Sequence, residues 1–372
     1  MEEKTEKKVC KSVDYINQTA RNLSEINEEI LEEFLRSIRQ SRRIILGAEG
    51  RSRSALLIGI KGIKKRTFTI TDSSFHWRNL KEAAIDLEKK RGTTILLINS
   101  GSGETSTPKQ LTEDLRGYIE EAGSKKFLIC TVTSKSESSI ARMSDTVLKM
   151  RGRGDDKGRA VNQLDFGIMG DIYELATTLL FHNIKKAINN GFNADKVLKA
   201  SQKEIKIIGA SIDRYLSSSH YQKLVEETSS RARIIFGGLG PAREVAEMTA
   251  LRTMHIKSVV GESAYLAGSF APPPKPGDVL VLISFSGETG PTLKWCSDYK
   301  AAGGIVFSIV GRESTLSKAS QSYVLGSSVE EFYQKVVFLL SPLPGGIMEK
   351  FRQCGIRIPE EIIRILGHSK TE

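Results

Sequence analysis

The sequence predicts an α/β protein in which one parallel-sheet unit occurs twice. Short apolar runs alternate with segments of helical periodicity along most of the chain, as expected for parallel strands with helices on both faces of a sheet. Two segments are nearly identical, because apolar runs at 95–98 and 280–283 both lead into Ser-x-Ser-Gly-Glu-Thr, at 100–105 and 284–289. An apolar run that ends in a Gly-containing turn is typical of a buried parallel strand. We therefore expect two related α/β domains.

The spacing of three landmarks supports a duplication. The Ser-rich loops at 100–105 and 284–289 are 184 positions apart, and the Gly-rich turns that begin at Gly47 and Gly237 are 190 apart. Glu174 and Glu330 each lie four residues after a glycine at the start of a helical segment, and they are 156 apart. The second copy is therefore 28 residues shorter at this point. These residues correspond to a charged, Gly-rich stretch around 151–159, which we expect to be a loop.

Periodicity and turn residues predict the other elements. An amphipathic helix is expected over 22–42, with its N-cap at Ser24 or Asn27, and residues 1–20 are expected to be frayed. Helices over 195–227 should link the copies. We expect domains at 1–192 and 193–342, followed by a helical tail at 343–372. Strands are expected at 43–46, 67–71, 94–99, 127–133 and 146–150 in the first copy, and at 232–236, 258–260, 280–283, 304–310 and 323–325 in the second.

The composition is that of a globular protein, with 39% hydrophobic and 27% charged residues. The apolar runs are too short to cross a membrane, and the N-terminal residues lack the apolar segment of a signal peptide. We therefore expect a cytoplasmic protein with no membrane partner. The four cysteines form no C-x-x-C pair, so we expect free thiols rather than a disulfide framework or a metal site.

The net charge of +11 is compatible with nucleic-acid binding. No aromatic-interleaved basic patch or recognition-helix pattern accompanies this charge, so we favour a Lys-rich solvated surface and expect no nucleic-acid partner. A basic surface would also attract a phosphorylated metabolite.

The Ser-rich loops are candidate phosphate sites. Hydroxyl groups and free backbone N–H groups between a buried strand and a helix N-terminus favour an anion, although a Ser/Gly turn can also simply cap the helix. The first Gly-rich turn adds Gly50, Arg51 and Ser52, whereas the second has Pro241 and Ala242 in the last two places. Neither turn matches a Walker loop or a dinucleotide fingerprint. The hydroxyl candidates are Ser100, Ser102 and Thr105 in the first loop and Ser284, Ser286 and Thr289 in the second.

Two carboxylates and one imidazole are the candidate proton-transfer groups. Glu174 and Glu330 lie in the first turns of predicted helices, where a carboxylate either interacts favourably with the helix dipole or acts as a general base. His255 lies on the helix after the second Gly-rich turn. A single histidine near a helix end is more often structural.

These motifs resemble the sugar isomerase (SIS) domain, a flavodoxin-like sheet that binds phosphosugars. Within that group they resemble 6-phospho-3-hexuloisomerase, and each copy keeps different parts of its pattern. The similar segments are 42–52, the loop at 100–105 and 169–174 in the first copy, and 250–256, 259–262 and 277–289 in the second.

The resemblance implies cofactor-free isomerisation of a ketose phosphate through an enediol, with no metal ion. The helix-start glutamate would be the base, and His255 would assist at the oxygens of the sugar. Because SIS domains pair, we expect the two copies to form a pseudo-dimer within the chain, and the sequence leaves open a further homodimer. We expect one composite site with Glu174 from the first copy and His255 from the second. The alternative is a non-catalytic phosphosugar sensor that has kept the pocket.

Overall fold

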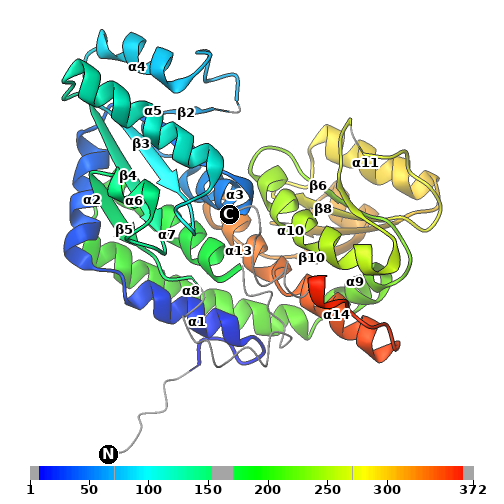
Figure 1. Cartoon of the computed structure of the whole chain (residues 1–372). Helices are drawn as coiled ribbons and strands as arrows, with labels where there is room; N and C mark the ends of the chain where they lie inside the picture. Colours follow the sequence, from blue (N-terminus) through cyan, green and yellow to red (C-terminus); the bar gives the residue numbers. More distant parts are fainter. Residues whose placement is uncertain (1–7, 71, 153–170, 270, 363–372) are drawn as a thin grey trace, which may run out of the picture. The chain divides into compact units, whose positions relative to one another are not determined.

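The computed structural model of the chain describes residues 8–70, 72–152, 171–269 and 271–362 (Figure 1). Contacts divide these residues into two compact units. The first-copy unit consists of 19–152 and 173–203, and the second-copy unit of 8–18, 171–172 and 204–362. Most of the charged stretch predicted to be a loop around 151–159 lies outside the described residues.

A five-stranded sheet forms the centre of the first-copy unit, and all its described strand pairs are parallel. The strand order is β2-β1-β3-β4-β5, which is the flavodoxin-like order. All six residues of the central strand β3 are buried, which explains its unbroken apolar pattern. The strands are β1 (Arg43–Ala48), β2 (Arg66–Thr69), β3 (Thr94–Asn99), β4 (Phe127–Thr133) and β5 (Thr146–Lys149).

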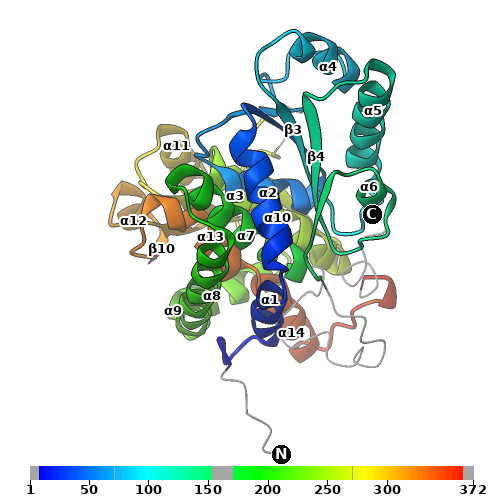
Figure 2. The ribbon, with the colours of Figure 1, turned by 90° about the vertical axis from the view of Figure 1, so that its left-hand side faces the viewer.

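Helices cover both faces of this sheet (Figure 2). On one face, apolar side chains of α4 (Leu80–Glu88), α5 (Ser106–Ala122) and α6 (Ser139–Arg142) form a core with Ile45, Leu96 and Ile98. The other helices of the unit include α2 (Glu28–Gln40), which contacts β4 and β5, and α3 (Gly50–Ile60), which contacts β1 and β3. In α3, Gly59 lies so close to Phe181 of α7 (Asp171–Asn190) that a Cβ would come within 2.5 Å of the Phe181 Cβ.

The second-copy unit repeats the sheet. Its order β10-β9-β8-β6-β7 is the same topology read from the opposite edge, and its pairs are also parallel. The predicted duplication of a parallel α/β sheet flanked by helices is confirmed. The strands are β6 (Ile234–Gly237), β7 (Ala264–Leu266), β8 (Val279–Ser284), β9 (Ile305–Val310) and β10 (Gln321–Val324). The helices from residue 194 onwards are α8 (Ala194–Leu216), α9 (Ser219–Ser229), α10 (Pro241–Lys257), α11 (Gly290–Ala301), α12 (Thr315–Ala319), α13 (Val329–Leu340) and α14 (Leu343–Gln353).

The predicted strand at 258–260 is wrong. These residues form a 3-10 turn, Ser258–Val260, and the strand that pairs with β6 is β7. Helix α10 continues to Lys257, whose fully buried ammonium group donates to the carbonyl oxygen of Thr228 at 3.0 Å and to that of Ser230. This buried anchor keeps the chain helical where its β-branched residues favour a strand.

The predicted fraying of the N-terminal residues is also wrong for those the structure describes. Asn17 Oδ1 accepts hydrogen bonds from the backbone of Val9 and Cys10, at 2.8 and 3.1 Å, and helix α1 spans Asp14–Ser24. The helix predicted over 22–42 is therefore two helices. The second one, α2, is capped by Asn27, whose side chain accepts from Ile30 N at 2.9 Å.

No described helix is long and apolar enough to cross a bilayer. Across the described ranges, no group of three or more His, Cys, Asp or Glu side chains is placed to hold a metal ion. The four cysteines are free thiols, of which only Cys354 is exposed.

Candidate functional site at the carboxyl ends of β1 and β3

In the first-copy unit, the predicted site residues follow the carboxyl ends of two adjacent strands. The turn after β1 starts α3 with Gly50, Arg51 and Ser52, and the loop at 100–105 joins β3 to α5. In a sheet of this order the strand order reverses between β1 and β3, and ligands of open α/β sheets bind at such a switch point. The topology therefore places both groups of predicted residues where a ligand is expected.

Three hydroxyl groups gather in the first Ser-rich loop. Thr105 Oγ1 lies 2.9 Å from Ser100 Oγ and 3.4 Å from Ser102 Oγ. Ser100 and Thr105 are buried, and Thr105 is the N-cap residue of α5 without capping it through its side chain. The serine oxygens also accept from the backbone N–H groups of Gly103 and Glu104, at 3.1 Å each. The hydroxyl groups therefore stabilise the turn and lie beside a helix N-terminus, an arrangement suited to a phosphate.

The glutamate of the repeated motif has a structural role, which sequence reasoning did not assign. Glu104 Oε1 accepts a hydrogen bond from Ser139 N, at the start of α6, at 2.7 Å. Glu288 Oε1 accepts from Thr315 N, at the start of α12, also at 2.7 Å. These backbone hydrogen bonds to the charged form lower the pKa of both carboxyl groups. The sequence indicated that this glutamate matters, because Glu104 and Glu288 are 184 positions apart, like the serine and threonine residues of the two loops.

A glycine beside each glutamate makes this contact possible. Gly103 and Gly287 have φ of +66° and +65°. A Cβ at either position would come within 2.0 or 1.9 Å of a serine hydroxyl, that of Ser138 or Ser314. Only glycine fits such a position, which explains why the motif is kept in both copies.

Arg51 and Glu174 form a buried ion pair in the first-copy unit. Arg51 Nη2 lies 3.3 Å from Glu174 Oε2, and their side chains are 11% and 5% exposed. Ser52, next along α3, is 2% exposed, and its Oγ has no hydrogen-bond partner within the described part of the chain. A buried hydroxyl group without a partner is unfavourable unless a ligand or water binds it. The structure thus brings Arg51 to Glu174, and Ser52 follows Arg51 in the first turn of α3.

Two further polar residues in this region were not predicted. Asn99 ends β3, and Tyr173 directly precedes Glu174 on α7. The Tyr173 hydroxyl lies 2.8 Å from Asn99 Oδ1, and Asn99 Nδ2 donates to the carbonyl oxygen of Ser52 at 2.8 Å. A comparison of the two copies could have indicated Asn99, because the second copy has the apolar Ile283 at the corresponding position and a polar residue in a buried strand is unusual.

The second-copy unit repeats the loop without the surrounding polar residues. Ser284 Oγ accepts from Gly287 N at 3.1 Å and Ser286 Oγ from Glu288 N at 3.2 Å, as in the first loop. Ala242 replaces Ser52, and Glu330 is exposed in the first turn of α13. Thr289 is the N-cap residue of α11, without a side-chain capping bond.

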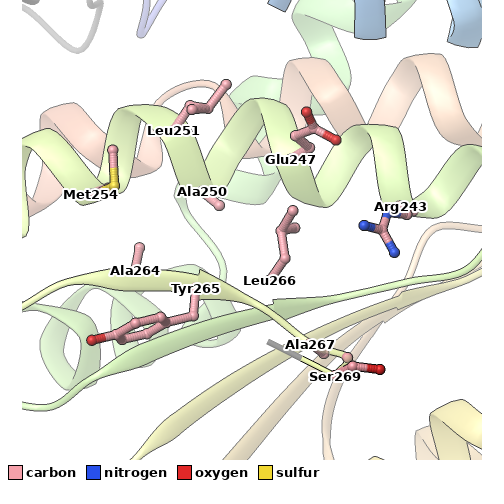
Figure 3. A pocket seen from close by; sticks show the side chains of 11 residues that line it. Arg243, Glu247, Ala250, Leu251, Met254, Ala264, Tyr265, Leu266, Ala267 and Ser269 are labelled. Atoms are coloured by element: carbon pink, nitrogen blue, oxygen red, sulfur yellow. The ribbon is translucent and has the colours of Figure 1, made fainter. Parts of the chain in front are cut away.

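His255 lies in the last turn of α10 and is partly buried. The expected composite of His255 with Glu174 stays a prediction. A pocket of about 460 Å³ lies along the same helix, between α10 and β7, and its lining includes Arg243, Glu247 and Leu266 (Figure 3). None of the predicted site residues lines this pocket, although all of them are described.

Neither protein-family models nor curated proteins matched this sequence, whereas solved structures did. Tagatose-6-phosphate ketose/aldose isomerase from Escherichia coli superposes with a TM-score of 0.60 at 15% identity, covering 91% of this chain and 92% of that one. The C-terminal domain of glucosamine-fructose-6-phosphate aminotransferase from Francisella tularensis gives 0.56 at 16% identity, covering 96% and 99%. Glucosamine-6-phosphate deaminase from Thermotoga maritima gives 0.52 at 14% identity, covering 92% and 94%. At such identities the likeness concerns the fold, and the two five-stranded parallel sheets give this chain the tandem SIS-domain fold.

Proposed function

We propose that this protein is a sugar-phosphate isomerase whose working site is in the first-copy unit. The observation that carries the proposal is the buried Arg51–Glu174 pair beside the partnerless Ser52 hydroxyl, at the switch point of the sheet. The solved structures with the same fold include proteins named for sugar phosphates, which supports this substrate class. The substrate we favour is a ketose phosphate, as for 6-phospho-3-hexuloisomerase.

Each group has a role in this proposal. The loop at 100–105 and the N-terminus of α5 would bind the phosphate. Glu174 would take a proton from the carbon next to the carbonyl group, giving an enediolate, and would return it to the former carbonyl carbon, while the hydroxyl proton of the first carbon passes to the other oxygen atom. Arg51 and Ser52 would hydrogen-bond to the oxygen atoms on which charge develops. The reaction moves protons between neighbouring carbon and oxygen atoms and leaves the protein unchanged.

Isotope exchange tests the proposal directly. The full chain is incubated in deuterated water with a panel of ketose and aldose phosphates, and the sugars are analysed by mass spectrometry. Carbon-bound deuterium that depends on Glu174 supports the proposal and identifies the substrate. Tight binding of a panel member without exchange, in wild type and Glu174→Gln alike, would contradict it and favour a phosphosugar sensor.

A further inference from the structure

We infer that Asn99 and Tyr173 are positioning residues, which fix the first turn of α3 against α7 and so set the geometry of Arg51, Ser52 and Glu174. The inference rests on the proposed function for its chemistry, but not for its geometry. Neither side chain is placed to be the base, because both are buried and hydrogen-bonded to protein groups.

The side chain of Asn99 connects three elements. Asn99 belongs to β3 and is fully buried. Its Nδ2 donates to the Ser52 carbonyl oxygen on α3 at 2.8 Å and lies 3.5 Å from Thr177 Oγ1 on α7. Its Oδ1 lies 2.8 Å from the Tyr173 hydroxyl, also on α7. One amide thus joins the helix that carries Arg51 and Ser52 to the helix that carries Glu174.

The Tyr173 hydroxyl is the partner of the oxygen end of that amide. It lies 2.8 Å from both Asn99 Oδ1 and the Val132 carbonyl oxygen on β4. Since a hydroxyl group has one proton, it donates to one of these acceptors at a time. The Ser52 carbonyl oxygen can only accept, so it keeps Nδ2 facing α3 and leaves Oδ1 facing the Tyr173 hydroxyl. Donation from that hydroxyl to Oδ1 then stabilises the amide in the orientation that pairs with α3.

The second copy shows that this arrangement is not required by the fold. The Tyr173 ring packs on Gly101, where a Cβ would lie 3.3 Å from its Cδ1 atom. At the corresponding positions the second copy has Phe285 for Gly101 and Val329 for Tyr173. The Phe285 ring instead packs on Phe332, with 5.6 Å between the centroids. The larger side chain is thus on the helix in the first copy and in the loop in the second. The hydrogen bonds of Asn99 and Tyr173 occur in the copy that has the buried Arg51–Glu174 pair.

The Tyr173→Phe variant tests the inference, since it removes only the hydroxyl group. We expect kcat to fall about 10- to 100-fold and KM to stay within about twofold, because the phosphate loop is untouched while the base is misplaced. Amide hydrogen exchange in peptides that cover residues 50–54 should become faster. Asn99→Asp, which loses the donor to Ser52 but keeps an acceptor for Tyr173, should show the same faster exchange.

Tyr221→Phe is the matched control, because Tyr221 is a buried tyrosine of the second-copy unit whose hydroxyl donates to the Pro342 carbonyl oxygen at 3.2 Å. It should lose stability but keep kcat and the exchange rates at 50–54. Unchanged kcat and exchange in Tyr173→Phe, or an equal loss of kcat in Tyr221→Phe, would overturn the inference. If the wild-type protein turns over no panel sugar, the proposed function fails, and the exchange rates alone decide the positioning role.

Discussion

Arg51 and Glu174 form an ion pair that is almost completely buried, with 3.3 Å between Nη2 and Oε2. Burial removes both charges from water, so a nearby opposite charge contributes to the stabilisation of each. A substrate oxygen that approaches Arg51 would compete with Glu174 for the guanidinium group. In the proposed reaction the pair would therefore connect ligand binding to the availability of the carboxylate.

The two glutamates at the starts of α7 and α13 should differ in their effect on activity. Glu174→Gln should lower kcat by about 10²- to 10⁴-fold, the usual contribution of a general base. Glu330→Gln should retain most of the activity, because Glu330 is exposed and its copy lacks the partner groups. Steady-state kinetics with the sugar identified by isotope exchange measures both. An equal loss in the two variants would contradict a single working site.

Loss of Arg51 should destabilise the protein through the charge that remains. Arg51→Met leaves Glu174 buried without its partner and should lower the free energy of unfolding by about 3 kcal/mol at neutral pH. Adding Glu174→Gln should recover much of this loss, because no unpaired charge remains. Urea denaturation of the wild type, both single variants and the double variant gives the coupling energy. A double variant as unstable as Arg51→Met would argue against the pair.

Sequence reasoning was most successful where structure depends on local pattern. The strand at 94–99 and the Ser-rich loops are found as predicted, because buried parallel strands and Gly-containing turns have strong local signals. The strand predicted at 258–260 failed because Lys257, buried against distant carbonyl groups, decides the local structure. The Asn99–Tyr173 contact joins residues 74 positions apart, and only a comparison of the two copies could have indicated it.

Glu104 should contribute to stability in a pH-dependent way. Glu104→Ala removes the acceptor for Ser139 N and should cost about 1 kcal/mol or less, since the carboxylate is partly exposed. Its pKa is lowered in the folded state, chiefly by that backbone hydrogen bond. The contribution is thus present above the unfolded pKa and is lost as the pH falls through the folded one. Thermal denaturation at pH 7 and pH 3.5 should show a smaller difference between wild type and variant at pH 3.5. A pH-independent difference would show that the charge is unimportant.

His220 should make the protein sensitive to acid. It is 8% exposed, its Nδ1 lies 3.3 Å from the Tyr215 hydroxyl, and burial lowers its pKa from 6.5 to about 4. At a pH between these two pKa values, His220 is protonated in the unfolded chain and neutral in the folded protein. Stability should therefore fall by up to about 1.4 kcal/mol per unit as the pH drops through this window.

His220→Gln should remove this part of the pH dependence, although the variant will be less stable at pH 7 because it loses ring contacts with Tyr215 and Phe307. The measurement is urea denaturation at several pH values between 7 and 4. His76→Gln, at an exposed histidine, is the control and should keep the wild-type pH dependence. If the wild type and His220→Gln lose stability in parallel as the pH falls, a group other than His220 causes the acid sensitivity. Because the ring lies against β9 and β10, its protonation would loosen the edge of the second sheet while leaving the Arg51–Glu174 site intact.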